Sequence, residues 1–245
     1  MQEILCFLPR KMTQTCKFPY KAADLFFLEV KYFMNSPTPI VIIGSQGFAK
    51  EIEWLISEIN RFHAPNAAFD FLGFIDQQEN PVNEHILGDD SWAMSQLSKE
   101  TQFVIAIGKP SLRKKLADKY MSEGFQPATL IHPSVQMSGS VSVGEGSLIC
   151  AGVIMTVDIA LGAFCILNLN STVGHGSLVG PFVTLSPGCH ISGEVKIGGE
   201  CELGTGSVIL PGCSLADQIT LGAGAVVTKD LTEVGTYVGT PARKL

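Results

Sequence analysis

Residues 131–232 read IHPSVQ MSGSVS VGEGSL ICAGVI MTVDIA LGAFCI LNLNST VGHGSL VGPFVT LSPGCH ISGEVK IGGECE LGTGSV ILPGCS LADQIT LGAGAV VTKDLT, which makes 17 six-residue units without an insertion. The first position is Ile, Leu, Val or Met in every unit, and the fifth is small or aliphatic. The second position is often Gly or Ser. A short, fixed period of this kind is the signature of a solenoid, and here it predicts a parallel β-helix.

The pattern can coil if each unit is a short strand followed by a corner. Positions one and five then both point inward, and Gly, Ser, Asp and Asn stand where the corner needs unusual dihedral angles. One unit alone buries almost nothing, so stability comes from stacking the units into a continuous aliphatic column. Four cysteines occupy position five and are expected to be small core residues: Cys165, Cys189, Cys201 and Cys213.

Composition argues against several classes of protein. The chain has 245 residues and a formal net charge of −6, which argues against a nucleic-acid-binding surface. No run of 18 apolar residues occurs and the N-terminus lacks a signal-peptide pattern, so no membrane span is expected. The seven cysteines form no CxxC pair and no zinc spacing. This usage predicts a reducing, cytoplasmic location and no metal site.

Residues 1–36 mix apolar and basic residues with no clear period. One interpretation is that the native chain begins at Met34, so that this leader is not native or is disordered. The alternative is a short helix over residues 22–33 that packs on the following domain. The first interpretation is favoured, and neither assigns a function to the leader.

Residues 37–130 alternate between strand and helix patterns. Apolar runs predict strands at 39–44, 69–76, 102–108 and 127–132, and between them lie predicted helices at 47–62, 91–98 and 110–124. Such alternation implies a small parallel sheet with crossover helices. The predicted fold class is therefore a Rossmann-like α/β domain over 37–130, followed by a β-helix with a C-terminal tail over 131–245.

The first predicted turn, Gly44 to Lys50, joins a strand to a helix. Glycines such as Gly44 and Gly47 leave main-chain N–H groups open at the helix N-terminus, which suits a phosphate or a ribose. The turn lacks a full GxGxxG pattern, so a tight turn without a ligand fits equally well. Asp76 ends the second strand, where a carboxylate can accept hydrogen bonds from ribose hydroxyls or a base N–H. An exposed aspartate at a strand end is also common without a ligand.

Several motifs occur in a characteristic order. They are a GxxGxAK turn, an FxGFxD strand, an AIG strand end followed by Arg113, LIHPS, an NxNSxVxH segment and a VGTPARKL terminus. From Pro39 to Leu245 the chain resembles the family of sialic-acid O-acetyltransferases and bacillosamine N-acetyltransferases, which carry hexapeptide repeats. The resemblance implies a left-handed β-helix with three units per coil. Residues i and i+18 would then stack about 4.8 Å apart.

The same resemblance implies an activity and its partners. Members of this family acylate sialic acid or nucleotide-linked amino sugars and use acetyl-CoA as the co-substrate. The first domain would hold the nucleotide sugar. The family is homotrimeric and binds acetyl-CoA between subunits. The chain is thus expected to be an acyltransferase with no metal and no nucleic-acid partner.

Acyl transfer from a thioester needs a base for the attacking group and a donor for the developing oxyanion. His175, which points outward at position three of VGHGSL, matches the catalytic histidine of the family. Gly193 lies 18 residues later and matches the family's oxyanion donor, and stacking places it beside the base. Asn168 matches a substrate-contacting asparagine, although asparagine also caps turns. The other histidines are expected at the surface (His63, His85), in a structural role (His132) and at a corner (His190).

The chain departs from the family pattern next to the base. Family members usually carry Asp or Glu directly after the catalytic histidine to hold its tautomer, whereas this chain has Gly176. Asp158 lies 18 residues before Gly176, so it is a hypothetical substitute from the preceding coil.

Other departures affect substrate contacts. Thr184 stands where some relatives carry a second ligand-side histidine. Phe48 and Gln77 replace a histidine and a second aspartate, and Lys109-Pro110 replaces a polar pair. Lys109 remains a candidate substrate-binding residue. The acceptor can therefore differ from that of the best-known relatives.

Acetyl-CoA is expected along an edge of the solenoid. Small residues would keep that groove open and offer main-chain amides: Gly193, Gly204, Thr205, Gly222 and Ala223. Lys229, Arg243 and Lys244 are candidates to meet the adenosine phosphates. For each of these cations, solvated surface charge is an equally good interpretation.

Three other functions are alternatives to acyl transfer for a chain with such a solenoid. A catalytically impaired sugar-nucleotide-binding or scaffold protein is favoured by Gly176 and opposed by His175, Asn168 and Gly193. A metal hydratase would need three converging histidines, which the spacing of His132, His175 and His190 does not provide. A nucleotidyltransferase would need a longer N-terminal domain. The acceptor sugar, the choice of N- or O-transfer and the acyl length are left open.

Overall fold

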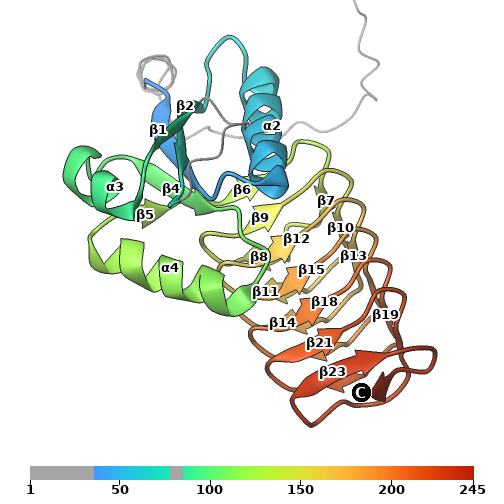
Figure 1. Cartoon of the computed structure of the whole chain (residues 1–245). Helices are drawn as coiled ribbons and strands as arrows, with labels where there is room; N and C mark the ends of the chain where they lie inside the picture. Colours follow the sequence, from blue (N-terminus) through green and yellow to red (C-terminus); the bar gives the residue numbers. More distant parts are fainter. Residues whose placement is uncertain (1–35, 78–84) are drawn as a thin grey trace, which may run out of the picture. The chain divides into compact units, whose positions relative to one another are not determined.

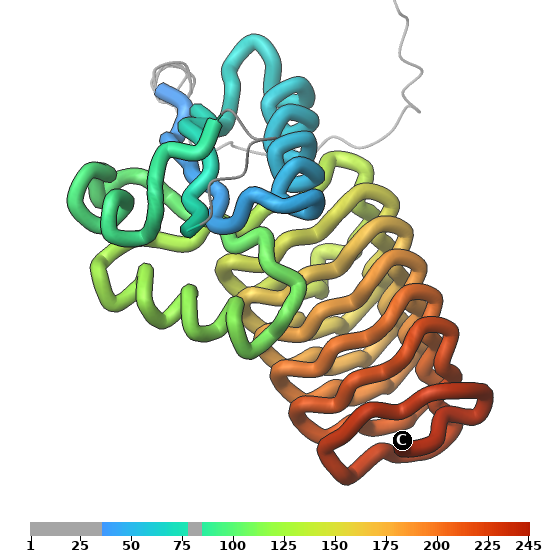
Figure 2. The backbone as a smooth tube through the Cα atoms, in the orientation of Figure 1, coloured from blue at the N-terminus to red at the C-terminus, as the bar shows by residue number. Residues whose placement is uncertain are grey.

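The computed structural model describes residues 36–77 and 85–245. The predictions for the leader, including the start at Met34 and the helix over 22–33, lie outside these residues. Residues 37–245 form one compact unit, drawn as a cartoon in Figure 1 and as a tube in Figure 2. Within the described residues, no helix combines the length and the apolar run needed to cross a bilayer.

The first part of this unit is a five-stranded parallel sheet in the order β3-β2-β1-β4-β5. Its strands are β1 (Thr38–Ile43), β2 (Phe69–Ile75), β3 (Ile86–Gly88), β4 (Gln102–Ile105) and β5 (Gln126–Pro127). The crossover helices are α2 (Gly47–Phe62), α3 (Asp90–Gln96) and α4 (Pro110–Ser122). Helix α2 buries its apolar stripe of Ile52, Leu55, Ile56 and Ile59, as its spacing predicts.

The predicted strand over 127–132 is in fact two strands that belong to different sheets. Strand β5 ends at Pro127, and the next amide, of Ala128, donates to the carbonyl of Phe103 in the first sheet. Strand β6 (Leu130–Ile131) instead pairs with β9 of the solenoid. The expected domain boundary between residues 130 and 131 therefore falls inside β6. Strand β3 was not predicted, because three residues are too short for a recognisable period.

The second part is a solenoid with three parallel sheets, which Figure 2 shows as stacked coils. From β6 to β22 the registers pair residue i with residue i+18, for example Ile154 with Thr172 and Thr172 with His190. At the C-terminal end, β23 pairs with β21 at a spacing of 16 residues, as in Ile219 with Gly235, and β24 runs antiparallel to β23. The coils wind in the left-handed sense (Figure 1). The predicted fold class, a small Rossmann-like α/β part followed by a left-handed parallel β-helix, is confirmed.

We name the three sheets by their positions in the coil. The first sheet contains β6, β9 (Leu148–Ile149), β12 (Ile166–Leu167), β15 (Thr184–Leu185), β18 (Glu202–Leu203), β21 (Ile219–Leu221), β23 (Gly235–Val238) and β24 (Arg243–Lys244). The second contains β7 (Gln136–Met137), β10 (Ile154–Met155), β13 (Thr172–Val173), β16 (His190–Ile191), β19 (Val208–Ile209) and β22 (Val226–Val227). The third contains β8 (Ser142–Val143), β11 (Ala160–Leu161), β14 (Leu178–Val179), β17 (Lys196–Ile197) and β20 (Ser214–Leu215).

The six-residue pattern maps onto the coil as predicted at its inward positions. From Ser147 onward, residues at positions one and five form one buried column, which includes Ile149, Cys189 and Cys201. In the first coil the pattern is incomplete, because Met137 at position one is 44% exposed. The five described cysteines are free and buried. The left-handed dihedral angles fall at position four, where seven of the residues with positive φ are glycines and seven are not. The corners are thus held by coil stacking, and glycine is not required at each of them.

The first solenoid sheet carries the α/β part. Its outward residues at position six, Leu130, Leu148 and Ile166, are buried in one cluster with residues of β1 and α2. Helix α4 adds Arg113, whose side chain is 1% exposed. Its guanidinium donates to the carbonyls of Phe164 (2.8 Å) and Phe182 (2.7 Å) at two successive corners. These contacts determine which side of the coil the α/β part covers.

Candidate functional site

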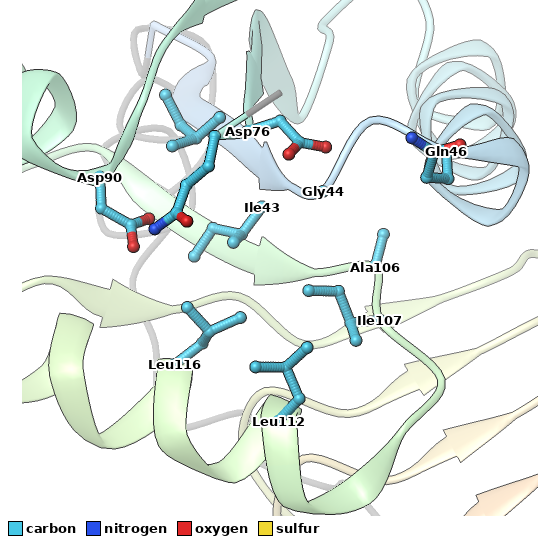
Figure 3. Close-up of a pocket in the computed structure, with 11 residues that line it drawn as sticks. Ile43, Gly44, Gln46, Asp76, Asp90, Ala106, Ile107, Leu112 and Leu116 are labelled. Atoms are coloured by element: carbon cyan, nitrogen blue, oxygen red, sulfur yellow. The ribbon is translucent and has the colours of Figure 1, made fainter. Parts of the chain in front are cut away.

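A cavity of about 350 Å³ opens at the carboxyl ends of β1, β2 and β4 (Figure 3). Strand order reverses between β1 and β4, which is where open α/β sheets bind ligands. In Figure 3, Leu112 and Leu116 project from α4 toward Ile43. The lining residues are Ile43, Gly44, Gln46, Ile75, Asp76, Gln77, Asp90, Ala106, Ile107, Leu112 and Leu116. Apolar walls with a few carboxylate and amide groups suit a flat heterocycle that carries polar substituents.

The turn after β1 brings three predicted residues together. The N–H of Gly44 donates to the carbonyl of Ile75 (2.8 Å), and φ of Gly44 is +100°, which favours glycine. The buried Ser45 hydroxyl donates to Asp76 Oδ2 (2.6 Å). Gly47 begins α2, and a Cβ there would meet nothing within 4 Å. Lys109, by contrast, is the exposed N-cap of α4 and does not line the cavity.

Sequence analysis missed Asp90 and the two leucines of α4. Asp90 is 6% exposed and lines the cavity, and its carboxylate accepts from the Tyr120 hydroxyl and from Lys119 Nζ, both at 2.8 Å. Burial and this hydrogen bond raise the pKa of Tyr120. The spacing of Leu112 and Leu116 was the available signal, because i and i+4 share one face of a helix.

His175 lies at the edge where the second sheet meets the third, between β13 and β14, and it is exposed. Its ring contacts Gly193 of the next coil: a Cβ built on Gly193 would lie 2.5 Å from Nε2. The N–H of Glu194 donates to the His175 carbonyl (2.7 Å), which holds the two coils in register here. The predicted pair of base and stacked glycine is thus brought together. The Gly193 N–H donates to no residue that the structure describes.

Two acids stand on either side of Gly176 in the corner column. The N–H of Gly176 donates to the carbonyl of Val157 (3.1 Å), so Asp158 stacks in the preceding coil. On the other side, a Cβ at Gly176 would lie 3.5 Å from Glu194 Cγ. Both acids are exposed. Over the described ranges, His175 makes no hydrogen bond or ion pair with either carboxylate.

The structure divides the expected acetyl-CoA residues between two edges of the solenoid. Gly193 and Lys229 share the edge of His175, Lys229 being three coils further along. A second edge, between the first and second sheets, carries Asn168, Gly204, Thr205, Gly222 and Ala223. Arg243 is exposed in β24, the last strand of the solenoid. These residues do not form one groove within a single chain.

His175 and the cavity lie on different sides of the solenoid. The α/β part covers the first sheet, whereas the edge of His175 joins the second and third sheets. In a three-sided coil this edge is the one opposite the first sheet. A ligand seated in the cavity therefore does not reach His175 of the same chain.

Thr184, which stands where some relatives carry a second ligand-side histidine, packs against α4 in this chain. It is 6% exposed, donates to the Gly108 carbonyl (2.7 Å) and accepts from Arg113 Nη2 (2.9 Å). One sequence expectation about a single residue is wrong. His190 lies in β16 and not at a corner, and its Nδ1 is 3.0 Å from Thr172 Oγ1. The reason is that position six belongs to the strand, while the corner comprises positions three and four.

The remaining histidines follow the expectations. His132 is buried, with Nδ1 accepting from the Ser134 N–H (3.0 Å), as a structural residue should be. His63 and His85 are exposed. Among residues 36–77 and 85–245, no three His, Cys, Asp or Glu side chains cluster closely enough to hold a metal ion.

Comparison with known families and sequences places both parts of the chain. Residues 39–120 match the family described as the PglD N-terminal domain. A GDP-perosamine N-acetyltransferase of Escherichia coli O157:H7 is 30% identical over 110 residues, which cover 45% of this chain. The match spans 50% of the length of that relative.

Comparison with solved structures covers more of the chain. The acetyltransferase domain of PglB from Neisseria gonorrhoeae is 27% identical with a TM-score of 0.79, and covers 85% of this chain and 100% of that domain. The same domain has been solved in complex with acetyl coenzyme A. PerB from Caulobacter crescentus, in complex with CoA and GDP-perosamine, is 30% identical with a TM-score of 0.75, and covers 84% of this chain and 97% of PerB.

The similarities to PglB and PerB extend over the α/β part and the solenoid together, because they cover 85% and 84% of this chain. On this basis the chain belongs to the family of hexapeptide-repeat sugar N-acetyltransferases.

Proposed function

We propose that the protein transfers an acetyl group from acetyl-CoA to the amino group of a nucleotide-linked sugar. The observation that carries this proposal is the contact between the exposed ring of His175 and Gly193. It combines a base that solvent and substrate can reach with an unused main-chain N–H in the adjacent coil. The relatives named above, which act on perosamine or bind acetyl-CoA, support the same chemistry.

Each residue at this edge has one task in the proposed reaction. His175 takes the proton from the acceptor amine as the amine nitrogen attacks the thioester carbon. The Gly193 N–H donates to the carbonyl oxygen, which gains negative charge in the transition state. The carbon–sulfur bond then breaks and the thiol of CoA leaves with a proton. Acetyl-CoA supplies the activated acetyl group.

The cavity of the α/β part is the proposed site for the nucleotide. Leu112, Leu116 and Ile43 offer apolar surface to the base. The turn from Gly44 to Gly47 offers N–H groups at the start of α2 to phosphate oxygens, and Asp76 can accept from a ribose hydroxyl. PerB has been solved in complex with GDP-perosamine, which supports a nucleotide-linked amino sugar as the acceptor class.

The assembly we propose is a homotrimer with active sites between subunits. The cavity and His175 lie on different sides of one solenoid, so one subunit has to offer its cavity to His175 of another. Exposed apolar side chains beside the edge of His175 support a subunit contact there: Ile154, Val157 and Leu178 are 38%, 43% and 48% exposed. A subunit contact of this kind can also complete the acetyl-CoA site. Gly204 and Gly222 of one subunit and Gly193 of a neighbouring subunit can then contact the same acetyl-CoA.

A cytoplasmic location is part of the proposal. The five described cysteines are free, and burial raises the pKa of Cys150 and Cys165 to about 12. Buried thiols with no disulfide partner suit a reducing compartment.

A second candidate function is a sugar-nucleotide-binding protein with impaired catalysis. One observation favours it: Gly176 follows His175, and no described acid holds the imidazole. In this case the cavity would bind its nucleotide normally while turnover was absent.

The two functions are separated by following thiol release from acetyl-CoA with UDP-, GDP- and CMP-linked amino sugars and with free sialic acid. We expect turnover with one nucleotide-linked amino sugar, and His175→Ala should lower kcat by at least roughly 100-fold. Turnover only with free sialic acid would move the acceptor to the O-acetyltransferase class. Nucleotide binding without turnover on any acceptor would establish the second function.

A further inference from the structure

The position after His175 carries no side chain, and the space it leaves is specific. Gly176 has φ +66°, and a Cβ added there would meet a single neighbour within 4 Å, the Cγ of Glu194, at 3.5 Å. The Glu194 side chain thus borders the volume that a side chain at 176 would occupy. An acid held at 176 and an acid supplied by Glu194 would approach His175 through the same space.

The main chain holds Glu194 next to His175. Its N–H donates to the His175 carbonyl (2.7 Å), and the preceding residue, Gly193, lies against the imidazole. The ring edge that contains Nε2 is the one over Gly193. The other nitrogen, Nδ1, is bonded to Cγ and therefore lies nearer the main chain of His175 than Nε2 does.

Glu194 also adopts a backbone conformation that a glutamate does not favour. Its φ is +59°, while the residues before and after it in the column, Gly176 and Gly212, are glycines with φ of +66° and +71°. A side chain in the left-handed region costs free energy relative to glycine. Glu200, the other glutamate in this conformation, pairs with Lys114. In the described residues Glu194 has no such partner.

We propose that Glu194, from the next coil, is the acid that orients His175 in place of the acid missing at 176. Its carboxylate accepts a hydrogen bond from Nδ1–H, so that the proton stays on Nδ1 and the unprotonated Nε2 faces the acceptor amine. A change of side-chain rotamer closes the contact, because the exposed glutamate has three rotatable bonds. Glu194 is a positioning residue, and the inference rests on the proposed function, in which His175 is the base.

The alternative acid is Asp158, on the opposite side of Gly176. Its N–H donates to Ser140 Oγ (2.8 Å), and no atom of Asp158 lies within 4 Å of a Cβ built on Gly176. An aspartate side chain is also shorter than that of glutamate by one methylene. The geometry therefore favours Glu194.

The test compares Glu194→Gln, Asp158→Asn and a matched control, Glu200→Gln, in the full-length protein. Glu200 has the same residue type and a similar φ of +57° at another edge of the coil. For Glu194→Gln we expect kcat to fall about 10- to 100-fold with little change in either KM. Glu200→Gln should keep the wild-type kcat. Adding Gly176→Glu to Glu194→Gln should restore most of the lost kcat, because an acid returns to the same space.

A spectroscopic measurement separates this inference from the proposed function. The ¹⁵N shifts of the His175 imidazole report which nitrogen carries the proton, with no need for turnover. We expect the Nδ1–H tautomer to dominate in the wild type and to lose population in Glu194→Gln. The inference would be overturned if Glu194→Gln kept both the kcat and the His175 tautomer of the wild type. It would also be overturned if only Asp158→Asn lost kcat and the Nδ1–H tautomer. If the wild type shows no turnover, the proposed function fails while the tautomer still decides the role of Glu194.

Discussion

The imidazole of His175 rests on Gly193 of the next coil, so closely that a Cβ on Gly193 would lie 2.5 Å from Nε2 and 2.6 Å from Cε1. The contact arises from the 18-residue stacking of the coil. Since a protein interior accepts no atoms at such a separation, any side chain at 193 displaces the ring. The glycine therefore sets both the position of the base and the access to its own N–H.

The first prediction concerns this contact. Gly193→Ala should lower kcat by at least roughly 100-fold, because the imidazole moves away and one oxyanion donor is covered. The exposed ring can rotate outward, so the thermal midpoint should change little. Steady-state kinetics and differential scanning calorimetry check the two expectations.

Gly139→Ala is the matched control for this change. Gly139 occupies position three of its unit, as Gly193 does, three coils earlier, and a Cβ there meets nothing within 4 Å. It should keep both wild-type kcat and wild-type stability. Equal activity of Gly193→Ala and Gly139→Ala would contradict the role of the His175 contact.

The second prediction concerns the separation of the cavity from His175. Asp76→Ala and His175→Ala should each be inactive alone, since one removes a cavity group and the other the base. Co-expressed in one cell, they should recover about one quarter of the wild-type rate, because random assembly restores an intact pair at about one interface in four. Separately purified and unexchanged oligomers provide the control. An inactive mixed assembly would contradict a site built between subunits.

The third prediction concerns Arg113. Its guanidinium makes five hydrogen bonds, to the carbonyls of Ile107, Gly108, Phe164 and Phe182 and to Thr184 Oγ1. Burial lowers its pKa to about 10. Arg113→Lys cannot reproduce this planar fork and leaves buried carbonyls without donors, so the free energy of unfolding should fall by about 2–4 kcal/mol. Urea denaturation measures this loss.

Lys114→Gln serves as the control for Arg113. Lys114 is the next residue of α4 and also contacts the solenoid, through a pair with Glu200 (2.6 Å). Because this pair is exposed, its loss should leave the denaturation midpoint nearly unchanged. Similar midpoints for Arg113→Lys and the wild type would show that the buried bonds contribute little.

The fourth prediction concerns pH. Burial lowers the pKa of His132 below its ordinary value of 6.5, with Arg61 adding to the shift and Glu58 opposing it. Nδ1 accepts from the Ser134 N–H, and the ring contacts Trp54 at a centroid distance of 5.4 Å. A proton on this ring therefore binds more readily in the unfolded chain than in the folded one.

This difference fixes the sign of the effect. Stability from His132 is fully present above about pH 6.5 and is lost as the pH falls from there through the lower pKa of the folded state. Thermal midpoints measured from pH 8 to pH 5 should decline more steeply for the wild type than for His132→Gln, which cannot titrate. Parallel curves for the two proteins would contradict the prediction.

Much of the fold could be predicted because it rests on local periodicity. A repeat of six with inward positions one and five requires a coil. The three units per coil implied by the family resemblance give the 18-residue register that places Gly193 beside His175, and the strand pairing has this register. The apolar stripe of α2 predicted its bounds of Gly47–Phe62 for the same reason. The sequence did not predict the short elements. Strand β3 and the separate strands β5 and β6 have two or three residues each, which is too few to show a period.

The candidate site was only partly predictable. Gly44 and Asp76 line one cavity because the ends of neighbouring parallel strands meet at one edge of a sheet, which sequence order implies. Gly47 follows at the start of α2. Asp90 lines the same cavity, where its carboxylate accepts a hydrogen bond from the hydroxyl of Tyr120, a residue 30 positions further along the chain. The contact of Thr184 with Arg113, from a helix 71 residues away in the chain, could not be predicted from its position in the repeat.

By itself the sequence determined the six-residue coil, because a fixed spacing along the chain places the inward residues. The 18-residue register and the pairing of His175 with Gly193 followed once the resemblance supplied three units per coil. Tertiary structure alone decided which of three equivalent sheets carries the α/β part. That choice depends on long-range burial of Leu148 and Ile166 and on the hydrogen bonds of Arg113. Through it, the cavity and His175 come to lie on different sides of one solenoid, and Glu194, not a neighbour in sequence, borders the space beside the base.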